Sequence, residues 1–320
     1  MTSRVRVIAP ATVANIGPGF DVLGLALEGP YDLVEAEPTG DGIVSLVEIT
    51  GDDGSLPTEA NENCVGVVAR DVLTRFAPAG AGVRLWLHKG LPLGSGLGSS
   101  AASSVAAALA TAVAVCPEVD RAALLDATRE GERLATGAAH PDNVAPSLLG
   151  GLVACVVREG DEVEAMRLPV ADGIVIVTVS PEIQIPTEEG RAVMPDRYSL
   201  ADVVANMSRV AGLVAGFASG DLERIGGCLE DRLATPYRKR LIPGFDDAMA
   251  SALSAGAVGG GISGAGPALF AVTDDRDRAS RVGAAMVEAF ARAGVRSVAR
   301  VSGIDDRGAR VVGPDWVPVT

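Results

Sequence analysis

The sequence predicts an α+β fold in two domains. Its 320 residues exceed the length of about 100–200 residues that a single domain usually has. Segments that alternate apolar and polar residues, as half-buried strands do, are interspersed with segments of helical apolar spacing. Because strands and helices do not alternate strictly, the pattern favours α+β over a doubly wound parallel sheet. We expect a first domain over residues 1–165 and a second over residues 166–320.

In the first domain, strands and helices are predicted in mixed order. Alternating or short apolar runs predict strands at residues 5–8, 32–37, 43–49, 83–88 and 152–157. Helical spacing predicts helices at residues 64–76, 121–136 and 142–149. Residues 99–115 are rich in alanine and carry no charge, which predicts a helix that is buried on every face.

The second domain repeats this mixture. Strands are expected at residues 174–179, 269–273 and 295–301. Helices are expected from the N-cap Ser199 to about residue 217, after Asp221, and at residues 245–254 and 276–292. Residues 258–266 are glycine-rich and are expected to form a loop.

The composition excludes several classes of protein. A net charge of -14 argues against a nucleic-acid binder, which needs a basic patch, and a hydrophobic fraction of 48% argues against disorder. The four cysteines form no CxxC pair, so they predict buried free thiols rather than a zinc or redox site. The first ten residues lack the apolar run of a signal peptide. We therefore expect a cytoplasmic protein.

Residues 90–117 contain no charged residue, which raises the question of a membrane span. A spanning helix needs about 20 strongly apolar residues, whereas the first half of this stretch is rich in glycine and serine. The stretch is better explained as a glycine loop that leads into a buried helix. No membrane association is expected.

The glycine loop at residues 92–102 has the sequence PLGSGLGSSAA. Alternate glycines let a backbone approach a ligand closely, and a following helix N-terminus attracts phosphate. The loop is neither a Walker A motif nor a dinucleotide fingerprint. The alternative explanation is a close-packed turn before a buried helix. Lys89, just ahead of the loop, either contacts phosphate or is a surface charge at the end of a strand.

A second glycine-rich segment lies at residues 259–267, with the sequence GGGISGAGP. It is explained either by a ligand-facing loop or by a strand-to-loop transition packed against another domain. The presence of two such segments in one chain favours a phosphate cradle more strongly than either segment does alone.

Three motifs in this order resemble the GHMP kinases, the family that includes galactokinase, homoserine kinase, mevalonate kinase and phosphomevalonate kinase. They are PATVANIGPGFD at residues 10–21, the loop at residues 92–102, and GISGAGP at residues 261–267. Three local strings are most similar to the members that phosphorylate homoserine. These are HPDNVAP at residues 140–146, IPTEEGR at residues 185–191 and PYRKRLIPG at residues 236–244.

The resemblance implies a ribosomal-S5-domain-2-like N-terminal domain and a ferredoxin-like C-terminal domain. ATP and the substrate would bind in the groove between them. The implied reaction is phosphorylation of L-homoserine by ATP to O-phospho-L-homoserine, a step toward threonine. The resemblance further implies Mg²⁺ as cofactor and a homodimer.

Site residues follow from the matched motifs. Ser100 and Glu132 would hold Mg²⁺, and two such oxygen ligands suit a hard cation. Asn143 occupies the position at which several GHMP kinases have an aspartate base. An amide cannot accept the proton in that way, so we expect Asn143 to orient the substrate hydroxyl.

Binding residues are expected around both ligands. For ATP they are Pro92, Leu93, Gly94, Ser95, Gly96, Leu97, Gly98, Ser99, Ser100, Ala101, Ala102, Lys89 and Asn63. For the substrate they are Asn15, Asp21, His140, Asn143, Arg191, Arg238 and Gly264. Of these, Asn15, Asp21 and His140 would face the amino group and hydroxyl. The two arginines would pair with the carboxylate, which the planar guanidinium group suits.

Two alternatives remain open from the sequence. One is another small-molecule kinase of this family that acts on mevalonate or shikimate. The other is a non-catalytic protein that senses a metabolite on the same fold.

Overall fold

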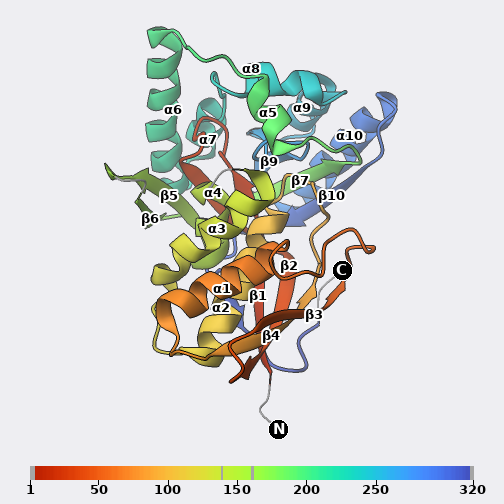
Figure 1. The fold of residues 1–320 in the computed structure, drawn as a ribbon. Helices are drawn as coiled ribbons and strands as arrows, with labels where there is room; N and C mark the ends of the chain where they lie inside the picture. Colours follow the sequence, from red (N-terminus) through yellow and green to blue (C-terminus); the bar gives the residue numbers. More distant parts are fainter. Residues whose placement is uncertain (1–3, 138–139, 160–161, 318–320) are drawn as a thin grey trace.

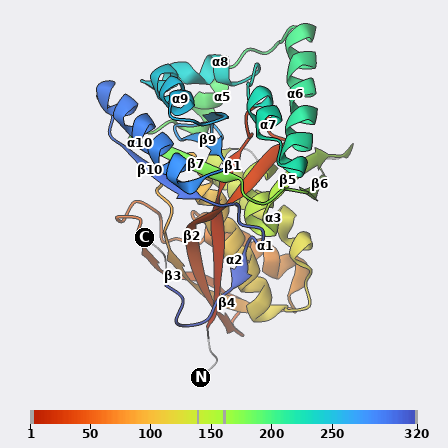
Figure 2. The ribbon, with the colours of Figure 1, turned by 180° about the vertical axis from the view of Figure 1, so that it is seen from behind.

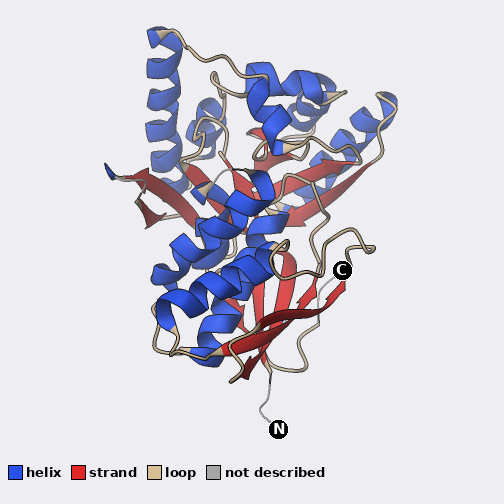
Figure 3. Cartoon of the chain, in the orientation of Figure 1, coloured by secondary structure: helices blue, strands red, loops and turns tan. Residues whose placement is uncertain are grey.

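The computed structural model describes residues 4–137, 140–159 and 162–317. Two sheets with helices packed on them confirm the α+β class (Figures 1 and 3). Most of the larger sheet lies in the lower half of Figure 1, and the smaller sheet lies above that part.

Among the described residues, the larger sheet has seven strands and is mostly antiparallel. Its main path runs β11 (Arg310–Val311), β1 (Val5–Ala14), β2 (Leu23–Thr39), β4 (Gly82–His88) and β3 (Val44–Thr50). The hairpin of β5 (Leu152–Val157) and β6 (Val163–Leu168) joins the first half of β2. β3 and β4 pair in parallel.

The described helices that accompany this sheet are α1 (Cys64–Phe76), α2 (Ser99–Val115), α3 (Leu125–Thr136) and α4 (Pro141–Leu149). A short 3₁₀ turn, η1 (Arg121–Leu124), precedes α3. The central helix α2 packs against β1 and β2 and against the other three helices. It is buried almost throughout as far as Ala112, which confirms the expectation for an uncharged alanine-rich helix. α2 therefore holds the glycine loop at its N-terminus in a rigid frame.

The smaller sheet has the order β10 (Ser297–Ser302), β7 (Val175–Pro181), β9 (Leu269–Thr273), β8 (Gly259–Ile262) and is antiparallel. α9 (Phe245–Ser254) precedes β8, and α10 (Arg276–Arg292) connects β9 to β10. This order of strands and helices is the ferredoxin-like arrangement that the resemblance implied. Figure 2 shows α9 and α10 on the outer side of this sheet.

Further helices lie between β7 and α9. They are α5 (Thr187–Ala192), α6 (Leu200–Ser219), α7 (Leu222–Cys228), α8 (Thr235–Arg238) and the 3₁₀ turn η3 (Lys239–Leu241). By length and composition alone α6 could cross a membrane, a test that core helices of soluble proteins also pass. Ser199 caps α6 and Asp221 caps α7, as expected from the sequence.

The structure differs from the expected elements in several places, and β6, α5, α8 and β11 were not expected from the sequence. Residues 23–39 form one long strand instead of a strand over residues 32–37 only. Residues 259–262 form strand β8 before the loop begins. The expected domain boundary at residue 165 falls inside β6, and β11 returns from the second half of the chain to pair with β1. The four cysteines are free, but only Cys155 is buried.

Candidate active site

A cavity of about 500 Å³ brings together most of the residues that the sequence singled out. Its lining includes the glycine loop, the start of α2, the N-terminus of α4 and the loop after β8. All seven expected substrate-binding residues line it: Asn15, Asp21, His140, Asn143, Arg191, Arg238 and Gly264. The expected site is therefore one space built from segments that are distant in the sequence.

The glycine loop passes through left-handed backbone at three alternate positions. Gly94, Gly96 and Gly98 have φ of 65°, 79° and 69°, which side chains rarely adopt. Gly98 immediately precedes α2, so the unsatisfied N–H groups of that 17-residue helix open toward the cavity. The Ser95 hydroxyl is buried there without a hydrogen-bond partner among the described residues. These are the features of a phosphate-binding loop.

Not every expected loop residue faces the cavity with its side chain. Leu97, Ala101 and Ala102 are fully buried in the hydrophobic core. Pro92 is exposed and does not line the cavity. A contribution of these residues to phosphate binding can come only from their backbone.

The second glycine-rich segment supports the first. The Ser263 hydroxyl donates a 2.6 Å hydrogen bond to the carbonyl of Gly96, and the N–H of Ala268 donates to the carbonyl of Ser95. A Cβ on Gly96 would lie 2.7 Å from the carbonyl oxygen of Gly266. The two segments are therefore packed against each other, and the second fixes the shape of the first.

Lys89 is buried, so it is not a strand-end surface charge. Its ammonium group forms an ion pair with Asp32, and the two side chains are 1% and 0% exposed. It also donates to the hydroxyls of Ser99 and Ser103 at 2.8 and 2.9 Å. Asp32 in turn accepts from the N–H groups of Gly90 and Leu91. This cluster anchors the start of the glycine loop to the first turn of α2.

Ser100 and Glu132 meet in the cavity as expected. The Ser100 hydroxyl donates a 2.6 Å hydrogen bond to Oε1 of Glu132, which is 3% exposed. Burial raises the pKa of Glu132 to about 7, because the charged carboxylate lacks solvation. A buried carboxylate beside a hydroxyl, next to a phosphate loop, is a donor set that fits Mg²⁺.

The motif at residues 10–21 turns through left-handed backbone at Asn15, Ile16 and Asp21. Asn15 holds this turn with its amide: Oδ1 accepts from the N–H of Asp21, and Nδ2 donates 2.9 Å to the carbonyl of Gly264. Its own N–H donates to Oδ2 of Asp142. Asn15 therefore positions Asp21, and its side-chain amide is already engaged within the protein.

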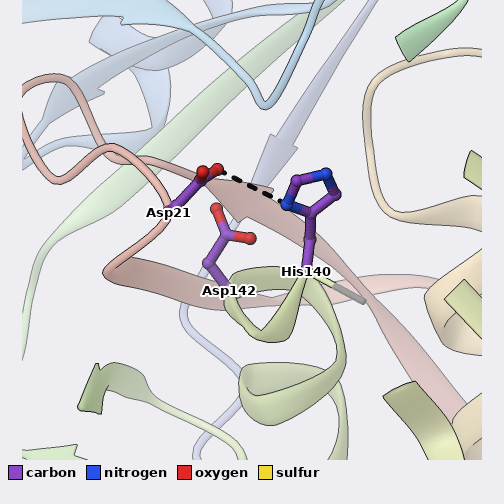
Figure 4. A group of neighbouring side chains, drawn as sticks. All are labelled: Asp21, His140 and Asp142. Carbon is purple, nitrogen blue, oxygen red and sulfur yellow. Dashed lines mark ion pairs between the residues drawn. The ribbon is translucent and has the colours of Figure 1, made fainter. Parts of the chain in front are cut away.

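Asp21, His140 and Asp142 gather at the substrate side of the cavity (Figure 4). One ligand atom from each lies within 4.8 Å of the others, and Nδ1 of His140 is 3.6 Å from Oδ1 of Asp21. Burial is the main cause that raises the pKa of Asp142 to about 7 and lowers the pKa of His140. The group gives the cavity an acidic corner.

Two arginines border this acidic corner. Nη2 of Arg191 lies 2.7 Å from Oδ2 of Asp21. Arg238 is 4% exposed and donates to the carbonyls of Gly190 and Gly264, each at 2.9 Å. Both guanidinium groups lie near the Phe20 ring, with Cζ at 5.6 and 5.0 Å from its centroid. Cations and carboxylates thus lie side by side, as a zwitterionic ligand requires.

Asn63 lines the cavity, but its amide is used for structure. Oδ1 accepts from the N–H of Val65, which caps α1, and Nδ2 donates to the carbonyl of Pro57. Asn61 pairs with Arg70 on the surface. Oδ1 of Asn61 is thus engaged, and both polar atoms of the Asn63 amide are used within the protein.

Sequence reasoning missed Asp142 and Asp32. Asp142 stands between His140 and Asn143 in the string HPDNVAP, and its place in the first turn of α4 was the available signal. Asp32 could have been found from strand pairing, because the register of Leu33 with His88 places it opposite Lys89.

The fold and the site together define an ATP-dependent small-molecule kinase. Two protein-family models match the chain. The model of the GHMP kinases N terminal domain matches residues 63–151, and that of the GHMP kinases C terminal domain matches residues 213–292. The chain belongs to the GHMP kinase family.

Relatives of this chain within the family include several homoserine kinases. The chain is 42% identical over 313 residues to the homoserine kinase of Arabidopsis thaliana, and the aligned region covers 96% of this chain and 84% of that protein. It is 39% identical over 294 residues to the homoserine kinase of Pyrococcus abyssi, covering 92% and 95%. The crystal structure of homoserine kinase from Cytophaga hutchinsonii superimposes with a TM-score of 0.91 at 40% identity and covers 98% of both chains.

Proposed function

We propose that this chain is a homoserine kinase, which transfers the γ-phosphoryl group of ATP to the side-chain hydroxyl of L-homoserine. The observation that carries the proposal is the charge pattern beside the phosphate loop: Arg191 and Arg238 lie next to the carboxylates of Asp21 and Asp142 in one cavity. An α-amino acid brings both a carboxylate and an ammonium group to such a site. Mevalonate and shikimate carry a carboxylate without an ammonium group, so they leave the acidic corner unpaired.

The roles follow from the geometry. The substrate carboxylate pairs with Arg191 and Arg238, and its ammonium group pairs with Asp21. Asn143 lies beside Gly98, since a Cβ on that glycine would be 2.9 Å from Oδ1 of Asn143. It therefore stands at the junction of the phosphate loop and the substrate corner, where it orients the hydroxyl.

The chemical step is a displacement at the γ-phosphorus. The homoserine oxygen bonds to phosphorus while the bond to the bridging oxygen of ADP breaks. The Asn143 amide takes no proton, so the hydroxyl proton goes to a γ-phosphate oxygen or to water. Catalysis then depends on positioning and on charge neutralisation around the phosphates.

Mg²⁺ belongs to the same proposal. Ser100 and Glu132 would hold it, and it would neutralise charge on the β- and γ-phosphates. The support is the donor chemistry: a buried carboxylate with a raised pKa and an adjoining hydroxyl in a cavity lined by the glycine loop. Calorimetry of ATP binding with Mg²⁺ and with EDTA, in the wild type and in Glu132→Gln, tests it.

We further propose a cytoplasmic homodimer that acts in threonine biosynthesis. Free cysteines support a reducing compartment. The dimer and the pathway rest on the resemblance to the family. Light scattering of the purified protein tests the dimer.

The deciding experiment is ADP release with L-homoserine compared with L-serine, L-threonine, mevalonate and shikimate. Turnover with L-homoserine at least tenfold above the others is expected. Preference for mevalonate or shikimate would replace the proposal with another kinase activity of this fold. ATP binding without turnover on any of these alcohols would favour the metabolite-sensing alternative.

A further inference from the structure

Thr12 connects the glycine loop to Asn143. It lies in β1 at the point where the register with β2 shifts, and it is fully buried. Its N–H donates a 3.0 Å hydrogen bond to the carbonyl of Leu97. Its hydroxyl donates a 2.7 Å hydrogen bond to Oδ1 of Asn143. One residue therefore holds both the loop and the amide at the junction of the two binding regions.

Gly98 packs against both Thr12 and Asn143. A Cβ at that position would lie 2.1 Å from Oγ1 of Thr12 and 2.9 Å from Oδ1 of Asn143, so only a glycine fits against the pair. The last glycine of the loop thus packs directly on the hydrogen bond between Thr12 and Asn143. A shift of the Asn143 amide would therefore displace the loop, and a shift of the loop would displace the amide.

The bond also determines which end of the Asn143 amide faces the ligands. Oδ1 is occupied by Thr12, and among the described residues Nδ2 has no hydrogen-bond partner, while Asn143 lines the cavity. An amide N–H₂ group is a donor, and donors are favoured beside phosphate oxygens and a hydroxyl oxygen. A carbonyl turned toward the phosphates would be repelled by their negative charge.

We propose that Thr12 is a positioning residue that sets the Asn143 amide with its N–H₂ group toward the substrate hydroxyl and the γ-phosphate. The inference rests on the proposed function, because it concerns phosphoryl transfer to that hydroxyl. It assigns Asn143 the role of a hydrogen-bond donor. Thr12 acts through Asn143 and touches neither ligand.

The test compares Thr12→Val with Thr12→Ser and with a matched control. Valine has nearly the shape of threonine but cannot donate, so kcat for L-homoserine is expected to fall about tenfold or more, with both KM values changed less than about twofold. Serine keeps the donor and is expected to restore most of kcat. Thr111→Val is the control, because that buried hydroxyl in α2 has no partner among the described residues. It is expected to match the wild type.

A double-mutant cycle separates positioning from general stability. In an Asn143→Ala background, Thr12→Val should lower kcat no further, since the group through which it acts is gone. Additive effects of the two substitutions would overturn the inference, and so would equal kcat in Thr12→Val and Thr111→Val. If Thr12→Val does not fold, Thr12→Ala compared with Thr12→Ser makes the same comparison. Failure of the wild type to release ADP with L-homoserine would instead count against the proposed function.

Discussion

Nη2 of Arg191 lies 2.7 Å from Oδ2 of Asp21, so two groups of opposite charge pair with each other in the free protein. A zwitterionic amino acid can enter between them, its carboxylate on Arg191 and its ammonium group on Asp21. One internal ion pair is then exchanged for two with the ligand. The internal ion pair limits the cost of leaving either charge unpaired before the substrate arrives.

Arg191→Ala should raise the KM for L-homoserine about tenfold to hundredfold, because a charged hydrogen bond to the carboxylate is lost. The KM for ATP should change little. Steady-state kinetics with each substrate varied in turn measures both. Arg296→Ala, at a guanidinium that is 87% exposed in a surface pair, should leave both constants unchanged. Equal increases in the two KM values would show that Arg191 does not bind the carboxylate.

Asp21→Asn should reduce the advantage that the substrate ammonium group gives. The wild type is expected to use 4-hydroxybutyrate, which is homoserine without its amino group, far less efficiently than L-homoserine. In the variant, kcat/KM for L-homoserine should fall about tenfold or more, while kcat/KM for 4-hydroxybutyrate falls less. A coupled ADP assay gives the ratio. An unchanged ratio would assign the ammonium group to another residue.

Glu132 makes stability depend on pH in a defined direction. Burial raises its pKa from 4.5 to about 7. The contribution of protonated Glu132 to the free energy of unfolding is therefore complete below pH 4.5, and it is lost as the pH rises through 7. At pH 8 without metal, Glu132→Gln should be more stable than the wild type, by at most about 3 kcal/mol. The pKa of Asp142 is also raised, so its effect on stability has the same pH dependence. The difference in stability between Glu132→Gln and the wild type isolates the part due to Glu132.

Thermal unfolding between pH 5 and 8.5 measures this difference, which should shrink toward pH 5. Adding Mg²⁺ at pH 8 should stabilise the wild type and not the variant. Glu288→Gln, at a side chain that is 75% exposed, serves as the control and should follow the wild type at every pH. A Glu132→Gln curve that coincides with that control would contradict the raised pKa.

Lys89→Met should destabilise the fold by about 3–5 kcal/mol, because Asp32 would remain buried without its partner. Replacing both residues, as Lys89→Met with Asp32→Leu, should recover part of the loss. Urea unfolding of the wild type and of these two variants measures both changes. If Lys89 served only to contact phosphate, stability would be unchanged and the KM for ATP would rise.

Asp305→Ala should also lower stability, by about 2–4 kcal/mol, with kcat unchanged. The Asp305 carboxylate is 3% exposed and accepts from Tyr31 and Arg310 and from two backbone N–H groups, which would lose their acceptor. The neighbouring Asp306 is exposed, so Asp306→Ala is the matched control. Similar melting temperatures for the two variants would show that the network contributes nothing.

Much of the fold could be predicted because local signals agree with the final packing. The bounds of α1 match the prediction, since its apolar spacing coincides with a cap: Asn63 accepts from the N–H of Val65. The first half of β2 could not be predicted. Gly29 and Pro30 interrupt the pattern there, yet the flanking residues pair with β1 on both sides of them.

The sequence predicted which residues form the site better than it predicted what each side chain does there. The sequence singled out Asn15, Asn63 and Lys89, but the polar atoms of each bond to groups inside the protein, including Gly264, Pro57 and Asp32 respectively. Which atoms remain free depends on neighbours that are distant in the sequence. Spacing along the chain does not contain that information.

The pairing of β11 with β1 has a consequence for synthesis on the ribosome. Val311 pairs with Val7, and Arg6 donates to the carbonyls of Gly313 and Pro314. β1 precedes the other described strands and β11 follows them, so one edge of β1 stays uncovered until residues 310–311 have been synthesised. The larger sheet starts first and finishes last, and the smaller sheet can form in the interval.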